Sequence, residues 1–110
     1  DLDAQIQHAD LVITAEGAID CQTLRGKVPA EIARRAAKYN KPVIALAGTL
    51  GNEAHCVYDI GIDAISSIVP RPMSLEHAIT QSETLIIQAT ERLIKSVLLG
   101  MKIAQQQRCV

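Results

Sequence analysis

Aromatic residues are nearly missing from this chain of 110 residues, which has no tryptophan, no phenylalanine and only Tyr39 and Tyr58. Nearly half of the residues are nevertheless hydrophobic. The core must therefore be built from Ile, Leu, Val and Ala, a composition common in proteins in which helices cover a parallel β-sheet. A chain of this length supports a single domain.

Concentrated charge and long apolar runs are also missing. The formal net charge is −1, which argues against a nucleic-acid-binding face, because such a face needs a concentrated basic patch. No run approaches the roughly 18 apolar residues of a membrane span, and no segment has the pattern of a secretory signal. We therefore expect no nucleic-acid partner, no membrane association and a cytoplasmic location.

Cysteine is sparse and unpaired in the sequence. Cys21, Cys56 and Cys109 lie far apart and form no Cys-x-x-Cys pair. This pattern is typical of a reduced cytosolic protein rather than a disulfide framework or a zinc site.

Apolar runs and turn residues predict the order β-α-β-α-β-α, after the end of a helix that runs to about His8. Strands are expected at 11–15, 43–47 and 64–69, and helices at 29–39, at 52–59 with Asn52 as its cap, and at 83–101, with a frayed tail at 105–108. Right-handed crossovers make the strands parallel, so the loops 16–27, 48–51 and 70–74 should share one edge. The predicted fold class is α/β, a parallel sheet with helices on both faces.

The most informative segment is 14–29, Thr-Ala-Glu-Gly-Ala-Ile-Asp-Cys-Gln-Thr-Leu-Arg-Gly-Lys-Val-Pro, which we call the motif segment. It follows a predicted strand and precedes a predicted helix, the place where open α/β sheets bind ligands. Glu16 and Asp20 suit a metal or a substrate hydroxyl. Lys27 beside Gly26, at a helix N-terminus, suits a phosphate or a carboxylate.

The motif segment matches neither common nucleotide-binding motif. A P-loop has four residues between its glycine and Gly-Lys, whereas eight residues separate Gly17 from Gly26 here, and Val28 replaces the required Ser or Thr. The pattern Gly-x-Gly-x-x-Gly occurs nowhere in the chain. A simpler interpretation is a polar turn in which the acids cap a helix and the glycines supply positive φ.

The motif segment resembles the glycerate kinases of the bacterial glyoxylate and glucarate pathways, which carry Asp-Leu-Val-Ile-Thr-Gly-Glu-Gly-Arg-Ile-Asp-Ser-Gln-Thr and then Gly-Lys-x-Pro. The matching positions are Asp10, Leu11, Val12, Ile13, Thr14, Glu16, Gly17, Ile19, Asp20, Gln22, Thr23, Gly26, Lys27 and Pro29. The likeness continues through 42–48, 61–64 and 72–76, and it covers about 9–100. It implies that residues 1–110 are a C-terminal segment of a flavodoxin-like α/β domain in an enzyme about three times longer.

Three positions depart from the family pattern. Ala15 replaces a glycine, Ala18 replaces an arginine, and Cys21 stands where serine is common. Ala15 is compatible with the pattern if its φ is negative. Ala18 removes a cation that could face an anionic substrate or nucleotide.

The resemblance implies transfer of the γ-phosphoryl group of ATP to a hydroxyl of glycerate, with Mg²⁺. Such chemistry depends on positioning and charge neutralisation. The expected catalytic residues are Glu16, Asp20 and Lys27, with Glu16 and Asp20 also as metal ligands. The expected substrate- or nucleotide-binding residues are Gly17, Gln22, Thr23, Gly26, Thr49, Gly51 and Arg71, although Arg71 also fits an ordinary solvated position between two prolines.

Two alternatives from other functional classes stay open. One is a non-catalytic α/β module that binds a small anion, and the other is a degenerate kinase remnant that acts as an interaction domain. The expected partners of the kinase segment are glycerate and the remainder of the kinase chain. The segment alone is expected to be inactive, and an unpaired sheet edge predicts that it self-associates.

Overall fold

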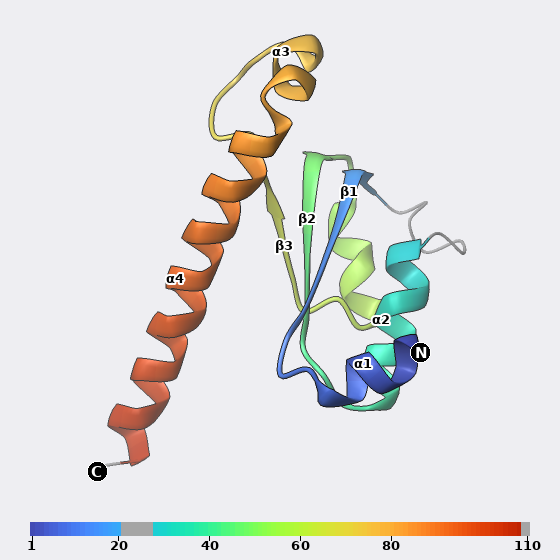
Figure 1. The fold of residues 1–110 in the computed structure, drawn as a ribbon, viewed down its shortest axis with the longest axis vertical. Helices are drawn as coiled ribbons and strands as arrows, with labels where there is room; N and C mark the ends of the chain where they lie inside the picture. Colours follow the sequence, from blue (N-terminus) through green and yellow to red (C-terminus); the bar gives the residue numbers. More distant parts are fainter. Residues whose placement is uncertain (21–27, 109–110) are drawn as a thin grey trace. The chain divides into compact units, whose positions relative to one another are not determined.

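The computed structural model describes residues 1–20 and 28–108 (Figure 1). The chain divides into two compact units, Asp1–Ile68 and Val69–Val110. The first unit contains the sheet and all of the described residues of the motif segment. The second contains two helices.

Three parallel strands form the sheet of the first unit. They are β1 (Val12–Ile19), β2 (Val43–Leu50) and β3 (Ala64–Ser67), and β2 lies between the other two (Figure 1). Parallel pairing joins β1 to β2 and β2 to β3. The prediction of an α/β fold built on a parallel sheet is confirmed.

Strands β1 and β2 extend further than the sequence indicates. Their backbones stay in register from the pair Val12 and Val43 to the pair Ile19 and Leu50. Pairing between backbone groups continues through residues whose side chains are more typical of loops. Glu16 therefore lies on a strand rather than in the loop where it was predicted.

Helices α1 (Leu2–His8), α2 (Val28–Lys38) and η2 (Ala54–Ile60, a 3₁₀-helix) pack with the sheet around one core. The buried members of this core are Ile6, Ile19, Ala33, Ala36, Val43, Ala45, Ala47, Ala54, Val57 and Ile62. Strand β2 contributes alternate residues, as expected when successive side chains point to opposite faces. The core is aliphatic, as the composition predicts, with Tyr39 packed against it only partly buried.

Helix α2 begins much as predicted, with Pro29 in its first turn, where no backbone N–H is needed. The Arg35 guanidinium pairs with Glu31 at 2.9 Å and with Asp3 of α1 at 3.3 Å. The hydrogen bond from Arg35 to Glu31 and the charge of Asp3 raise the pKa of Arg35 above its usual value. All three side chains are partly exposed, so neither pair contributes much stability, and only the pair of Arg35 with Asp3 joins α1 to α2.

Two turns and one cysteine test further predictions. Asn40 follows the end of α2 in the left-handed region, with φ 59°. Asn52 does not cap the next helix: Glu53 takes the N-cap position with φ 60° and makes no side-chain cap bond, so η2 begins only at Ala54. Cys56 in η2 is disulfide-bonded, and the prediction of reduced thiols is wrong for this residue.

The second unit contains α3 (Leu75–Thr80) and α4 (Ser82–Arg108). Ser74 caps α3 by accepting a hydrogen bond from the His77 N–H at 3.1 Å. Helix α4 continues through the residues predicted to form a frayed tail. In the described part of the chain, neither α4 nor any shorter helix has an apolar stretch sufficient to span a membrane.

Two glycines should respond to alanine in opposite ways. Gly61 has φ 105°, and an added Cβ would lie 3.0 Å from the Ala33 carbonyl oxygen, so Gly61→Ala should lower the free energy of unfolding by about 1–3 kcal/mol. Gly100 lies inside α4 with open space around it, so Gly100→Ala should raise helix stability by roughly 0.5–1 kcal/mol. Urea denaturation followed by circular dichroism measures both. Changes of the same sign would contradict the opposite roles assigned to the two glycines.

Candidate functional site

The carboxyl ends of β1 and β2 meet closely at one edge of the sheet. The Gly51 N–H, just past β2, donates a hydrogen bond to the Ile19 carbonyl at 2.8 Å. Three residues before Gly51, an added Cβ on Gly48 would lie 2.9 Å from the carbonyl oxygen of Gly17 on β1. Glycine at position 48 is therefore required for the two strands to approach each other in this way.

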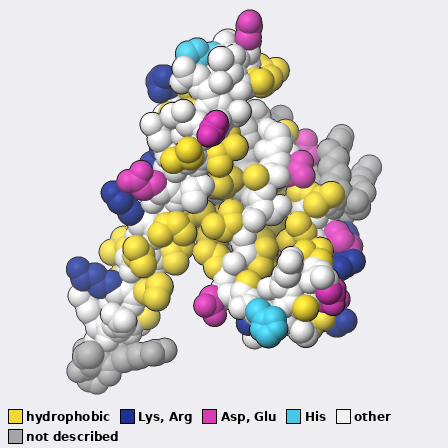
Figure 2. All heavy atoms as spheres, viewed as in Figure 1, with side chains coloured by type: hydrophobic (Ala, Val, Ile, Leu, Met, Phe, Trp, Pro, Cys, Tyr) yellow, Lys and Arg dark blue, Asp and Glu magenta, His cyan; other side chains and the backbone are white. Residues whose placement is uncertain are grey.

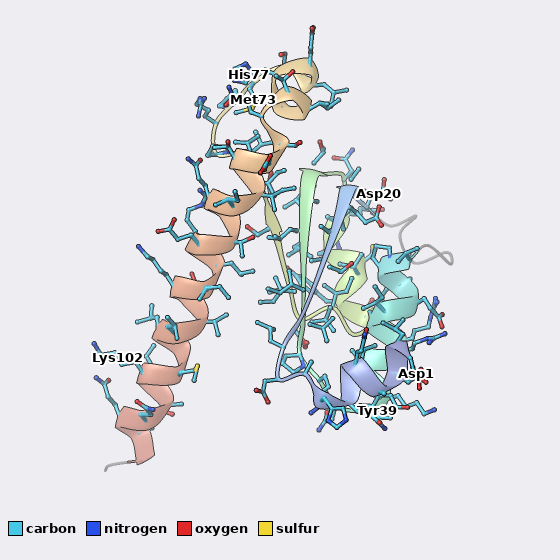
Figure 3. All side chains as sticks on the ribbon, viewed as in Figure 1. Asp1, Asp20, Tyr39, Met73, His77 and Lys102 are labelled. Carbon is cyan, nitrogen blue, oxygen red and sulfur yellow. The ribbon has the colours of Figure 1, made fainter. Side chains whose placement is uncertain are left out.

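Asp20 lies at this edge, directly after the last residue of β1 (Figure 3). A Cβ on Gly51 would lie 3.1 Å from the Asp20 Cβ and 3.8 Å from its Oδ2. The bare backbone of Gly51 thus makes room for the Asp20 side chain. The predicted convergence with residues 48–51 is confirmed for Gly17, Ile19 and Asp20, while residues 21–27 lie outside the described residues and 70–74 belong to the second unit.

Glu16 lies on the same strand, four residues before Asp20, and its side chain is half-buried. In the register of the sheet it stands opposite Ala47. The described residues include no group of three His, Cys, Asp or Glu side chains placed to hold a metal ion. Mg²⁺ does not need such a group, because it usually takes one or two carboxylates and completes its shell with water and phosphate oxygens.

Strand β3 adds a residue that sequence reasoning missed. The Ser67 hydroxyl donates a hydrogen bond to the Gly48 carbonyl at 3.4 Å, and the Ile68 N–H donates to the Ala47 carbonyl at 2.8 Å. These bonds bring the end of β3 to the same edge as Gly48. The available signal was the pair of serines near the end of a predicted strand.

Backbone angles test the simpler interpretation of the motif segment, in which its glycines supply positive φ. Among the described glycines only Gly61 has positive φ, so Gly17, Gly48 and Gly51 do not serve to supply that conformation. Ala15 also lacks positive φ and pairs normally with Leu46 of β2, so it replaces the family glycine without backbone strain.

The remaining predicted site residues fall into three groups. Thr49 is exposed on β2, opposite Ala18 of β1, at the edge that carries Asp20. Arg71 is exposed and belongs to the second unit. The others lie outside the described residues: Gln22, Thr23, Gly26 and Lys27.

Comparison with known proteins agrees with this geometry. The model of the "Glycerate kinase family" matches residues 1–98. A glycerate kinase of Halalkalibacterium halodurans is 48% identical over 88 residues, which are 80% of this chain and 23% of that protein. A glycerate kinase of Bacillus subtilis is 40% identical over 105 residues, which are 96% of this chain and 26% of that protein.

The chain also matches a relative whose name specifies the position phosphorylated and a protein of known structure. The glycerate 2-kinase of Escherichia coli is 38% identical over 103 residues, 94% of this chain and 27% of that protein. A crystal structure described as a glycerate kinase 2 from Salmonella typhimurium LT2 aligns with a TM-score of 0.65 and 37% identity, over 92% of this chain and 25% of that one. The chain thus spans about a quarter of the length of these relatives.

Alanine substitutions at two glycines of this edge should differ in their effect on stability, because only one of the two glycines is required for packing. Gly48→Ala should lower the free energy of unfolding by about 1–3 kcal/mol, because the new Cβ meets the Gly17 carbonyl oxygen. Gly17→Ala should change it by less than about 0.5 kcal/mol, because a Cβ at Gly17 meets none of the described residues within 4 Å. Thermal denaturation of both variants checks this difference, and equal losses of stability would refute it.

Proposed function

Since this chain belongs to the glycerate kinase family, we propose that it supplies part of the site at which ATP phosphorylates glycerate. The observation that carries the proposal is the position of Asp20 against the bare backbone of Gly51, at the carboxyl edge of a parallel sheet. Open α/β sheets bind ligands at this edge.

Asp20 and Glu16 are proposed as the acids of the site. Their oxygens are the ligand type that Mg²⁺ prefers, and either carboxylate could instead orient the glycerate hydroxyl. Mg²⁺, when bound, would neutralise charge on the phosphate oxygens of ATP. Asp20 suits such a role because close backbone contacts with Gly51 fix where its side chain leaves the sheet.

Gly17 is proposed to contact a ligand directly. It has neither positive φ nor a close neighbour that a Cβ would meet, so packing of the described residues does not explain a glycine there. A ligand that approaches the strand closely would explain it. Thr49 and Gly51, at the same edge, would add hydrogen bonds to glycerate or to the nucleotide.

The sequence alone supports the proposed role of the rest of the motif segment. Lys27 follows Gly26 just ahead of α2, where an ammonium group and free backbone N–H groups suit a phosphate. Gln22 and Thr23 are proposed as polar contacts to substrate or nucleotide. Arg71 is proposed to hold the carboxylate of glycerate.

The 2-hydroxyl of glycerate is the proposed acceptor. The Escherichia coli relative, of which this chain matches 27%, is named for phosphorylation at that position. The product, 2-phosphoglycerate, is a direct substrate of enolase, whereas 3-phosphoglycerate is not. An enolase-coupled assay therefore distinguishes the two products.

The 110-residue chain alone should not release ADP in the presence of ATP, Mg²⁺ and glycerate, because it spans about a quarter of its relatives. A chimera in which it replaces the matched 105-residue stretch of the Bacillus subtilis enzyme should do so. A coupled ADP-release assay compares the two proteins. An inactive chimera that folds and still binds phosphate would favour the anion-binding module, and a folded chimera with neither property would favour the degenerate remnant.

Within that chimera, Asp20→Asn should lower kcat by about 10²–10⁴, because the amide can neither bind the metal as a carboxylate nor accept a proton. Its free energy of unfolding should change by less than about 0.5 kcal/mol. Asp59→Asn, an exposed acid in η2, is the matched control and should change neither quantity. If Asp20→Asn lowered stability but kept normal turnover, Asp20 would have a structural role and not a catalytic one.

A further inference from the structure

A hollow of about 310 Å³ lies where β2 and β3 begin, at the end of the sheet opposite the candidate functional site. Figure 3 shows Tyr39, which directly precedes this part of the chain, and Asp20 at opposite ends of the first unit. The hollow is lined by Ala37, Asn40, Lys41, Pro42, Gly61 and Asp63. Its volume is at the lower end of the roughly 300–1,000 Å³ found for small-molecule sites.

Backbone contacts at the end of α2 fix the shape of this hollow. Asn40, with φ 59°, turns the chain away from the helix, and the Lys41 N–H donates a hydrogen bond to the Ala36 carbonyl at 2.9 Å. A Cβ on Gly61 would lie 3.2 Å from the Ala37 Cβ, so the backbone of Gly61 lies directly against α2. The walls of the hollow are therefore held in place by the fold itself, without a ligand.

The hollow contains one cation and one anion that do not pair. Lys41 is half-buried and Asp63 is exposed. The Asp63 Oδ2 accepts a hydrogen bond from the Val43 N–H at 2.8 Å, which fixes the carboxylate but does not neutralise its charge. Among the described residues, neither Lys41 nor Asp63 has an ion-pair partner, and the two charged groups do not pair with each other. Both charges are thus available to a ligand.

These charges favour a ligand that carries both signs. The C-terminal end of α2, a helix of 11 residues, adds partial negative charge on the side of Asp63. A simple anion would meet that negative charge, and a simple cation would meet the Lys41 ammonium. On the face of the first unit seen in Figure 2, acidic and basic side chains are interspersed, so this face has no patch of one sign to attract a polymer of the opposite charge.

We propose that this hollow binds a small aliphatic α-amino acid as its zwitterion. The ammonium group of the ligand lies toward Asp63 and the last carbonyls of α2. Its carboxylate lies toward the Lys41 ammonium and the Asn40 amide, and its short apolar side chain lies toward Ala37 and Pro42. This binding site goes beyond the proposed kinase function and does not depend on it, because Asp20 and Glu16 take no part in it.

L-alanine is the probe, added to the 110-residue chain and to the chimera with the Bacillus subtilis enzyme. Saturation-transfer NMR should show binding at millimolar concentration. Propionate lacks the ammonium group and ethylamine lacks the carboxylate, so each should bind about tenfold more weakly or worse, because each leaves one charge of the hollow unpaired. Binding by either protein with these preferences supports the proposal. Absence of L-alanine binding to both, or equal binding of propionate or ethylamine, would overturn it.

Charge-removing variants test the two assigned contacts. Lys41→Gln and Asp63→Asn should each weaken L-alanine binding by about tenfold or more, and Asp63→Asn keeps an oxygen for the Val43 N–H. Lys38→Gln and Asp59→Asn are the matched controls, because they remove the same charges at exposed positions outside the hollow, and they should leave binding unchanged. Equal losses in the controls would assign the effect to net charge and contradict the proposal.

Amide resonances locate the ligand in the unmodified protein, even if a variant does not fold. In protein labelled with ¹⁵N-glycine, the Gly61 resonance should shift when L-alanine is added. The resonances of Gly17 and Gly51, at the opposite end of the sheet, should not shift. An unchanged Gly61 resonance would overturn the proposal, and shifts confined to Gly17 and Gly51 would do so by placing the amino acid at the candidate functional site.

Discussion

Parallel backbone pairing between β1 and β2 is the interaction on which the first unit depends. Strand β2 lies between the other two strands, and all five residues from Val43 to Ala47 are buried. Its register with β1 continues to the Ile19 and Leu50 pair, and the Gly51 N–H extends it by one more bond to Ile19. Because the strands run in the same direction, residues that follow them in sequence arrive at one edge together.

Small residues set how closely the chain segments at that edge approach. Gly48 leaves room for the Gly17 carbonyl, and Gly51 leaves room for the Asp20 side chain. Packing therefore explains two of the glycines near the candidate site. It does not explain Gly17, at which an added Cβ would meet none of the described residues within 4 Å.

Strand β1 connects the candidate site to the incomplete part of the sheet. Its carboxyl end leads into Asp20, and among the described residues no strand pairs with its outer edge. A strand added there would fix the position of β1 on both sides, and with it the position of Glu16 and Asp20.

The sequence by itself determined the α/β class, the order of the main strands and helices along the chain and the identity of the motif segment. Apolar runs such as Val43–Ala47 predict buried strands, while Pro29 and Asn40 mark the limits of a helix, because these are local effects of side-chain type on the backbone. It placed Glu16 in a loop and made Asn52 a cap, and both were wrong.

Only the tertiary structure decided those points. Glu16 lies on a strand because the backbone of β1 keeps its pairing with β2, which no property of a glutamate side chain reveals. The contact of Asp20 with Gly51 and the bond from Ser67 to Gly48 join residues that are distant in sequence. Their proximity depends on the register of the strands and on the space available where a glycine has no side chain. Both are set only when the strands pair.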